Sequence, residues 1–249
     1  MDKINLGNFN ILILAAGTGS RIGPEGKKIP KSLFKINKKR IIDYLMQMLI
    51  KKKAKKIHIM TGYKSSLIKK YLKKYNDVQI TFRKIKDYKK NGHSYTWYKY
   101  KDLCEKSKKT TILFHADILF NEKYLNNIVK SNKKNVIGIK KYSKKLKKGI
   151  FYVSKNNSYV KKISKMPNIK KPVGEVIGIN KISYPLMKKI FLFMKIYFKK
   201  KDKKKFSWEI VIDQFIQENP RTFQVLNDQN YPWININRIS DYYAAKKIF

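Results

Sequence analysis

The chain has 249 residues, of which 43% are hydrophobic and 30% are charged, and its net charge at neutral pH is +43. This length and apolar content predict a large buried core and exclude global disorder. The charge alone would suggest nucleic acid as a partner, but only five of the 59 basic residues are arginine, the residue best suited to bidentate phosphate and base recognition. We therefore predict no nucleic-acid partner, and we expect the positive field to attract small phosphorylated substrates.

A single cysteine, Cys104, excludes an internal disulfide and a cysteine-rich zinc site. The first residues lack the apolar core and the cleavage site of a signal peptide, and no apolar run approaches the roughly 20 residues of a membrane span. The sequence therefore predicts a cytoplasmic protein without a membrane-spanning segment.

Strands and helices alternate through about the first 130 residues. Buried strands are expected at four short apolar runs, Asn10–Leu14, Ile57–Met60, Val78–Phe82 and Thr111–Phe114. Helices are expected where apolar residues recur at helical spacing, over Ile41–Lys53, Ser65–Lys74 and Tyr95–Leu103, and Ser65 or Ser66 is a candidate cap. This alternation predicts an α/β fold with a mostly parallel sheet, helices on both faces, and ligands at the carboxyl ends of the strands.

After about residue 131 the pattern changes to short strands separated by polar turns. Strands are expected over Val136–Ile139, Gly149–Val153, Tyr159–Ile163, Gly174–Ile179 and Tyr231–Ile236. An apolar stripe from Leu186 to Phe198 predicts a helix that faces the core or a homodimer partner, whereas Lys199–Lys205 should form a solvated loop. A helix is expected over Val211–Glu218, and Ser240 is expected to cap a final helix.

A glycine-rich segment, LAAGTGSRIGPEGKKIPKSL from Leu14 to Leu33, follows the first predicted strand. It matches neither the P-loop pattern nor the dinucleotide fingerprint, because Ile22 stands where the third glycine of the fingerprint belongs. Its small residues would let several backbone N–H groups converge on an anion, and Arg21 and Lys31 would add positive charge to the same phosphates. An ordinary glycine-rich turn on a basic surface is the alternative.

The strings LAAGTGSR and PKSL resemble the signature of nucleotidyltransferases that load phosphorylated sugars or small alcohols onto a nucleoside triphosphate. The resemblance is greatest to the phosphocholine cytidylyltransferase-like branch, and further pieces agree in order: Thr61–Tyr63, the HADILF string, Gly174–Ile179, Trp208-Glu209 and a terminal PWININ. It implies a Rossmann-like mixed sheet of the nucleotide-diphospho-sugar transferase type. It also implies a single domain, 1–249, with a nucleotide-binding half at about 1–130 and an acceptor-binding half at about 131–249.

The resemblance further implies a reaction in which a phosphate or phosphonate oxygen attacks the α-phosphorus of a nucleoside triphosphate, CTP being favoured, and pyrophosphate leaves. Arg21 and Lys31 are the implied catalytic residues, since the main task is to position and neutralise anions. Nucleotide binding is implied for Leu14, Ala15, Ala16, Gly17, Thr18, Gly19, Ser20, Arg21, Gly62, Tyr63, Asn91, Gly92 and His93. For His93, a plain surface position is an equal alternative.

Mg²⁺ is the implied cofactor. Asp117 follows an apolar strand at the place where the family has a metal-binding aspartate, although a strand-end aspartate can also cap a turn. The second implied ligand is Asn237, where the family usually has aspartate. An asparagine oxygen can bind Mg²⁺ but brings no charge, so we predict weaker metal affinity than at a site with two aspartates.

Acceptor binding is implied for Tyr95, Glu175, Trp208 and Glu209. Together with Tyr231 and Trp233, some of these side chains could line a box for a cationic head group. Core packing is the alternative, and it is the favoured one for Trp233. Glu209 could instead cap the helix that follows it.

The expected acceptor is phosphocholine, an aminoalkyl phosphonate or a phosphorylated amino-acid amide, and its product would serve capsule or cell-surface polysaccharide or lipid synthesis. Two alternatives remain at this point. One is a sugar-1-phosphate nucleotidyltransferase that uses another triphosphate, and the other is a catalytically silent regulatory protein that only binds a nucleotide.

Overall fold

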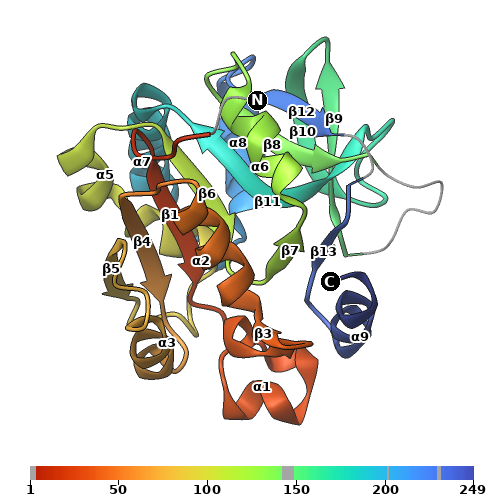
Figure 1. Ribbon diagram of the computed structural model, residues 1–249. Helices are drawn as coiled ribbons and strands as arrows, with labels where there is room; N and C mark the ends of the chain where they lie inside the picture. Colours follow the sequence, from red (N-terminus) through yellow and green to blue (C-terminus); the bar gives the residue numbers. More distant parts are fainter. Residues whose placement is uncertain (1–3, 142–148, 201, 229–230) are drawn as a thin grey trace.

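The strands form one large sheet and two small ones (Figure 1) within residues 4–141, 149–200, 202–228 and 231–249, which the computed structural model describes. The large sheet contains β1 (Asn10–Ala15), β4 (Lys56–Thr61), β5 (Gln79–Lys84), β6 (Thr111–His115), β8 (Val136–Lys140), β9 (Phe151–Asn156), β10 (Tyr159–Lys165), β11 (Gly174–Ile182) and β12 (Gln224–Asp228). The small sheets pair β2 (Lys35–Ile36) with β3 (Lys39–Arg40), and β7 (Ile118–Phe120) with β13 (Trp233–Asn235).

The two halves of the large sheet differ in strand direction. The strand order is β5-β4-β1-β6-β11-β8-β12-β10-β9. The first four strands are all parallel, because helices cross over between them. From β11 onward most pairs are antiparallel, the pair of β8 with β12 being parallel. The predicted α/β fold with a mixed sheet is therefore confirmed, but the parallel pairing expected for most of the sheet is concentrated in the amino-terminal half.

Helices cover both faces of the sheet, as predicted. The α-helices are α1 (Pro24–Lys28), α2 (Ile41–Lys51), α3 (Ser65–Leu72), α4 (His93–Tyr98), α5 (Lys101–Ser107), α6 (Glu122–Lys130), α7 (Tyr184–Tyr197), α8 (Trp208–Glu218) and α9 (Ile239–Ile248), and the 3₁₀ turns are η1 (Ser20–Ile22), η2 (Lys31–Leu33) and η3 (Lys203–Lys205). Buried residues of α2, α3 and α6 pack on one face, and those of α4, α5, α7 and α8 pack on the other.

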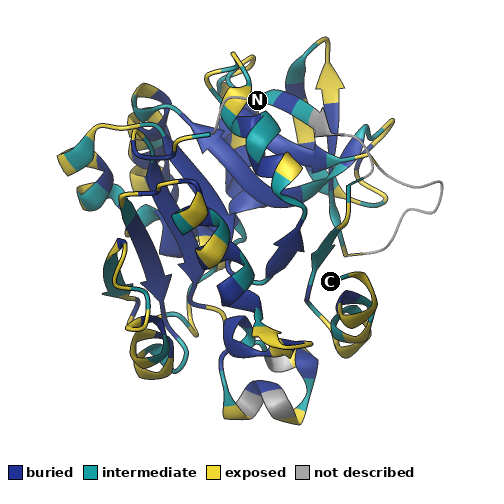
Figure 2. Ribbon diagram, viewed as in Figure 1, coloured by how far each residue is buried: buried dark blue, intermediate teal, exposed yellow. Residues whose placement is uncertain are grey.

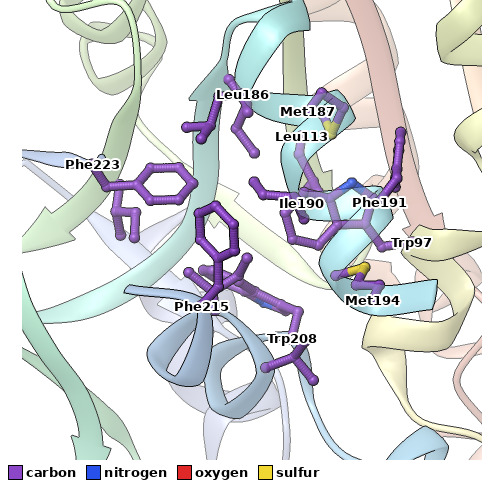
Figure 3. Packing of buried hydrophobic residues seen from close by; sticks show 14 of the residues in the cluster. Trp97, Leu113, Leu186, Met187, Ile190, Phe191, Met194, Trp208, Phe215 and Phe223 are labelled. Carbon is purple, nitrogen blue, oxygen red and sulfur yellow. The ribbon is translucent and has the colours of Figure 1, made fainter. Parts of the chain in front are cut away.

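The core lies on both sides of the parallel strands, of which β1 and β6 are buried along their length (Figure 2). Successive side chains of β1 alternate between the faces, so Ile13 packs with α2 and α3 whereas Leu12 packs with α4, α7 and α8. Figure 3 shows the second of these clusters, in which residues of α7 face Trp208 and Phe215 of α8. The stripe predicted between Leu186 and Phe198 is therefore a core-facing helix surface.

Several predicted helix boundaries and caps are wrong; for example, the helix expected from Val211 begins at Trp208. The helix expected over Tyr95–Leu103 is two helices, because the Tyr100 N–H bonds the Trp97 carbonyl at the tighter three-residue spacing and ends α4. Neither Ser65 nor Ser66 caps α3, since the Ser65 hydroxyl pairs with the Thr61 hydroxyl at 2.6 Å. Ser240 lies inside α9 rather than before it.

Candidate active site

The glycine loop, residues 16–19 between β1 and η1, lies at the carboxyl edge of the parallel strands. Gly19 adopts a φ of 67°, in the left-handed region, and a Cβ at this position would lie 3.2 Å from Lys31 Cβ. Glycine therefore lets the loop turn tightly against η2, which begins at Lys31. The end of β4 is also close to this loop, because the N–H of Tyr63, two residues after β4, donates to the Ala16 carbonyl at 3.2 Å. The chain thus brings the loop, Lys31 and Tyr63 to one edge.

The small sheet of β7 and β13 brings the end of the chain to the same edge (Figure 1). In its register Asn235 lies opposite Ile118, and beyond that pair the Ile236 N–H donates to the Asp117 carbonyl at 3.0 Å. The next residue, Asn237, is fixed by its own N–H, which donates to the Asp241 carboxylate at 2.9 Å. Backbone pairing therefore places Asn237 beside Asp117.

Arg21, Lys31, Asp117 and Asn237 form one polar cluster. The Lys31 ammonium makes an ion pair with the Asp117 carboxylate, and these two side chains are only 13% and 18% exposed. Arg21 Nη2 donates to Asn237 Oδ1 at 3.0 Å, and Lys31 Nζ donates to the same oxygen at 3.3 Å. The structure thus brings together the two cations and the two oxygen donors that the sequence singled out.

The charge balance of this cluster favours an anionic ligand. Burial raises the pKa of Asp117, but the Lys31 ammonium and the two nearby histidines lower it, and the net result is a pKa below its usual value. The carboxylate therefore neutralises one of the two cations, and Asn237 adds no charge. The oxygens of Asp117 and Asn237 are hard donors that could hold Mg²⁺ together with water and phosphate oxygens.

Two histidines and an indole lie next to the cluster. Trp208 Nε1 donates to His115 Nε2 at 2.7 Å, and the His93 and His115 rings meet edge to face with centroids 5.7 Å apart. Burial lowers the pKa of His115 to about 4. The pKa of His93 is also lowered, because many protein atoms surround its ring even though part of the residue is exposed to solvent. Both rings are therefore neutral at pH 7. A Cβ added to Gly17 would lie 3.9 Å from His93 Nε2, so His93 faces the glycine loop.

Glu209, in the first turn of α8, is a buried carboxyl group. Its Oε2 atom has no hydrogen-bond partner among the described residues. Burial raises the pKa of Glu209 to about 7; Lys165 opposes this rise, whereas the Asp117 carboxylate adds to it. The group therefore titrates near neutral pH and lies within electrostatic range of the polar cluster.

Several sequence-predicted site residues lie elsewhere or make other contacts. Asn91 uses its amide nitrogen in a turn, donating to the Asp87 carbonyl at 3.0 Å. The Gly92 N–H donates to the Lys204 carbonyl in η3. A Cβ at this position would lie 2.1 Å from the Phe206 carbonyl oxygen, so this close packing explains the glycine. The Tyr95 ring packs edge to face on Phe198 at the end of α7.

The remaining predicted residues have the following places. Leu14, Ala15 and Ala16 are buried, Gly17 is exposed, Thr18 is partly buried, and only the backbone of Ser20 is described, in η1. Gly62 is tightly packed, since a Cβ there would lie 2.7 Å from the Ala16 carbonyl oxygen. Glu175 lies on β11, opposite Lys140 of β8 and Tyr152 of β9.

The predicted aromatic box for a cationic head group is not formed. Trp208 is fully buried and packs edge to face on Trp97. Figure 3 shows both side chains within the buried cluster. Trp233 donates its Nε1–H to the Ile177 carbonyl at 3.0 Å and packs in the core of the other face, as favoured above. Tyr231 packs edge to face on Tyr124. Trp208 therefore belongs to the core, whereas Tyr231 and Trp233 are partly buried and pack against the core of the other face.

Sequence reasoning missed His115 and Lys165. His115 is part of the HADILF string, two residues before Asp117, and that proximity was the available signal. No sequence signal distinguishes Lys165, because it is one of many lysines. Only the fold places its ammonium 4.7 Å from the centroid of the Phe151 ring and within electrostatic range of Glu209.

This α/β sheet with a polar cluster containing two cations at its carboxyl edge is the arrangement expected of a nucleotide-binding enzyme. The nucleotidyl transferase family model matches residues 10–248, and the chain therefore belongs to that family. It is 28% identical over 197 residues to CTP:phosphoglutamine cytidylyltransferase of Campylobacter jejuni, covering 74% of this chain and 77% of that protein. It is 31% identical over 122 residues to choline-phosphate cytidylyltransferase of Streptococcus pneumoniae, covering 48% and 50%.

Solved structures share the fold over nearly the whole chain. The inositol-1-phosphate CTP transferase from T. maritima superposes with a TM-score of 0.79 at 18% identity and covers 97% of this chain and 96% of that one. The CTP:phosphocholine cytidylyltransferase from Streptococcus pneumoniae gives a TM-score of 0.79 at 21% identity, with coverages of 97% and 99%. None of the helices in the described part of the chain has the length and apolar content needed to cross a membrane.

Proposed function

We propose that this protein is a CTP-dependent cytidylyltransferase that transfers CMP to a small phosphorylated acceptor and releases pyrophosphate. The observation that carries the proposal is the cluster of Arg21, Lys31, Asp117 and Asn237 beside the glycine loop. The two named cytidylyltransferase relatives support CTP as the nucleotide. Membership of the family favours an enzyme over a silent nucleotide-binding protein.

In the proposed reaction an acceptor phosphate oxygen attacks the α-phosphorus of CTP. A new bond forms from that oxygen to the α-phosphorus, and the bond to the bridging oxygen breaks, so pyrophosphate takes the electron pair. A phosphate monoester is already anionic at neutral pH, since its second pKa is about 6, so no side chain has to remove a proton. Arg21 and Lys31 would reduce the repulsion between anions and stabilise the charge that builds up on the leaving pyrophosphate.

Mg²⁺ is proposed as the cofactor, with Asp117 and Asn237 as the side chains that would hold it. When bound, the ion supplies further positive charge to the phosphates. The oxygen donors suit a hard cation, and the presence of only one carboxylate is consistent with a metal that takes its other ligands from water and the triphosphate.

Among the acceptors considered, we favour a phosphorylated amino-acid amide. A quaternary ammonium group is best bound by open aromatic faces. Of the rings expected to offer them, Trp208 is buried, and Tyr95, Tyr231 and Trp233 are partly buried and pack against other side chains. The Oε2 atom of Glu209 is instead an acceptor that could receive an N–H from an amide. The relative that shares most of its length with this chain is named for phosphoglutamine. We further propose a cytoplasmic reaction, where CTP is supplied, whose product serves cell-surface polysaccharide synthesis.

Pyrophosphate release across a panel of nucleotides and acceptors tests this function. The panel combines CTP, UTP, dTTP, GTP and ATP with phosphoglutamine, phosphocholine, 2-aminoethylphosphonate and glucose 1-phosphate. We expect release with CTP and a non-sugar acceptor, and the fastest release with phosphoglutamine.

Two other outcomes would each favour an alternative. Release with UTP and glucose 1-phosphate would identify a sugar-phosphate enzyme, an alternative that has its own support in 30% identity over 84 residues, one third of this chain, to a UTP–glucose-1-phosphate uridylyltransferase of Haloferax volcanii. Binding of CTP without release from any pair would favour the silent regulatory protein.

A further inference from the structure

The position between Asp117 and Asn237 is held by a side chain of the protein itself. Lys31 Nζ pairs with Asp117 Oδ2 and also donates to Asn237 Oδ1 at 3.3 Å. Arg21 donates to the same Asn237 oxygen at 3.0 Å. The two side chains that would hold a divalent cation are therefore both engaged by the protein's own cations.

The ion pair is partly shielded from water, which strengthens it. Lys31 and Asp117 side chains are 13% and 18% exposed, so their attraction is screened less than that of a surface pair. The backbone of Lys31 is fixed as well, since its Cβ lies against Gly19 and η2 begins at this residue. Only the flexible end of the side chain can move when a ligand arrives.

The rest of the site offers a divalent cation little else. Within the described ranges, no three or more His, Cys, Asp or Glu side chains gather in a way that could hold a metal ion. Asp117 and Asn237 alone leave most of the six positions around Mg²⁺ to water and phosphate. A triphosphate would supply those oxygens, and its negative charge would also compete with Asp117 and Asn237 for Lys31 and Arg21.

We propose that Lys31 is an internal counter-ion that occupies the metal position of the free protein and moves to the triphosphate when the nucleotide binds. The divalent cation consequently binds together with the triphosphate and not before it, which makes the two binding events mutually favourable. This inference rests on the proposed function, because that function supplies both the metal and the triphosphate.

Binding of Mn²⁺ alone, measured by electron paramagnetic resonance of the free ion, tests the inference without any catalysis. The wild-type protein should bind Mn²⁺ weakly, whereas Lys31→Met should bind it about tenfold more tightly, because Asp117 loses its cation. The matched control is Lys35→Met, which removes one exposed lysine of the same segment and should bind Mn²⁺ as the wild type does. Adding Asp117→Asn to Lys31→Met should abolish the gain.

Equal Mn²⁺ affinity in the wild type and Lys31→Met would overturn the inference, as would an equal gain in Lys35→Met. Circular dichroism shows whether each variant is folded. If Lys31→Met is not folded, Lys31→Gln replaces it; the same gain in Mn²⁺ affinity is expected, and the absence of that gain would again overturn the inference. The proposed function has a separate readout, because its failure would appear as absent pyrophosphate release whatever the Mn²⁺ affinities are.

Discussion

The two sides of the site are stabilised in different ways. On the side of the glycine loop, Arg21 and Lys31 are charged and bond to oxygens of Asp117 and Asn237. On the side of α8, His115 and Trp208 are buried and bond to each other as neutral groups, and Glu209 is buried with a pKa raised to about 7. The first side is therefore suited to a highly charged ligand, and the second to a part of the substrate with little charge.

This difference would let one site bind a triphosphate and a small acceptor together, as the proposed function requires. Charged side chains that already have partners can exchange those partners for phosphates with little desolvation cost. A buried neutral group can discriminate by hydrogen bonding, because an unpaired polar atom in such a place is costly. Four substitutions would break or sharpen the contrast.

The largest effect is expected for Lys31→Ala, on the charged side. Removing a group that is proposed to stabilise the leaving pyrophosphate should lower kcat/KM for CTP by about 10²- to 10³-fold. Steady-state pyrophosphate release measures this, and Lys35→Ala, which removes an exposed lysine from the neighbouring β2, should stay close to wild type. Comparable losses in both variants would show that only the overall positive charge matters.

Glu209→Gln should affect the pH dependence of stability on the buried side. The pKa of Glu209 is raised from 4.5 to about 7 in the folded protein, so the folded state binds the proton more tightly than the unfolded state does. The free energy of unfolding should therefore fall as the pH rises from about 4.5 to 7, by up to about 3 kcal/mol.

Urea unfolding of Glu209→Gln and wild type at pH 5 and pH 8 checks this. The variant lacks the titrating group, so it should lose less stability than the wild type over that interval. Parallel losses in the two proteins would contradict the raised pKa.

Trp208→Phe should destabilise the protein by about 1–3 kcal/mol, because it leaves the buried His115 Nε2 without its donor. Trp97→Phe is the matched control, since the Trp97 Nε1 atom is buried and has no hydrogen-bond partner among the described residues. The two indoles pack on each other, so both substitutions lose similar apolar contact. Equal destabilisation in urea unfolding would mean that the bond to His115 contributes nothing.

Asn237→Asp should have the smallest effect. A second carboxylate would give the proposed metal ion a second charged ligand and lower the Mg²⁺ concentration for half-maximal activity by roughly three- to tenfold. The same carboxylate would also attract Arg21 and Lys31, which contact Asn237 Oδ1. Titration of Mg²⁺ in both proteins measures the change, and an unchanged metal dependence would remove Asn237 from the site.

The sequence by itself determined the parallel half of the fold and the grouping of Arg21 with Lys31 after β1. Continuous apolar runs such as β1 and β6 predict buried parallel strands. The strings around Arg21 and Lys31 lie within one short segment between β1 and β2, so local pattern suffices to group them. The patterns gave no indication of α6, β7 or β12. These elements are short or of mixed polarity, and their positions depend on partners far away in the chain.

Only the tertiary structure decided the far side of the site. Asn237 reaches Asp117 because β13 pairs with β7, and no local pattern encodes a contact between residues so far apart in sequence. Composition could not show whether Trp208 binds a ligand on its ring face or packs in the core, because an indole suits both roles. That choice was made by packing, which buried Trp208 against Trp97 and turned its N–H toward His115.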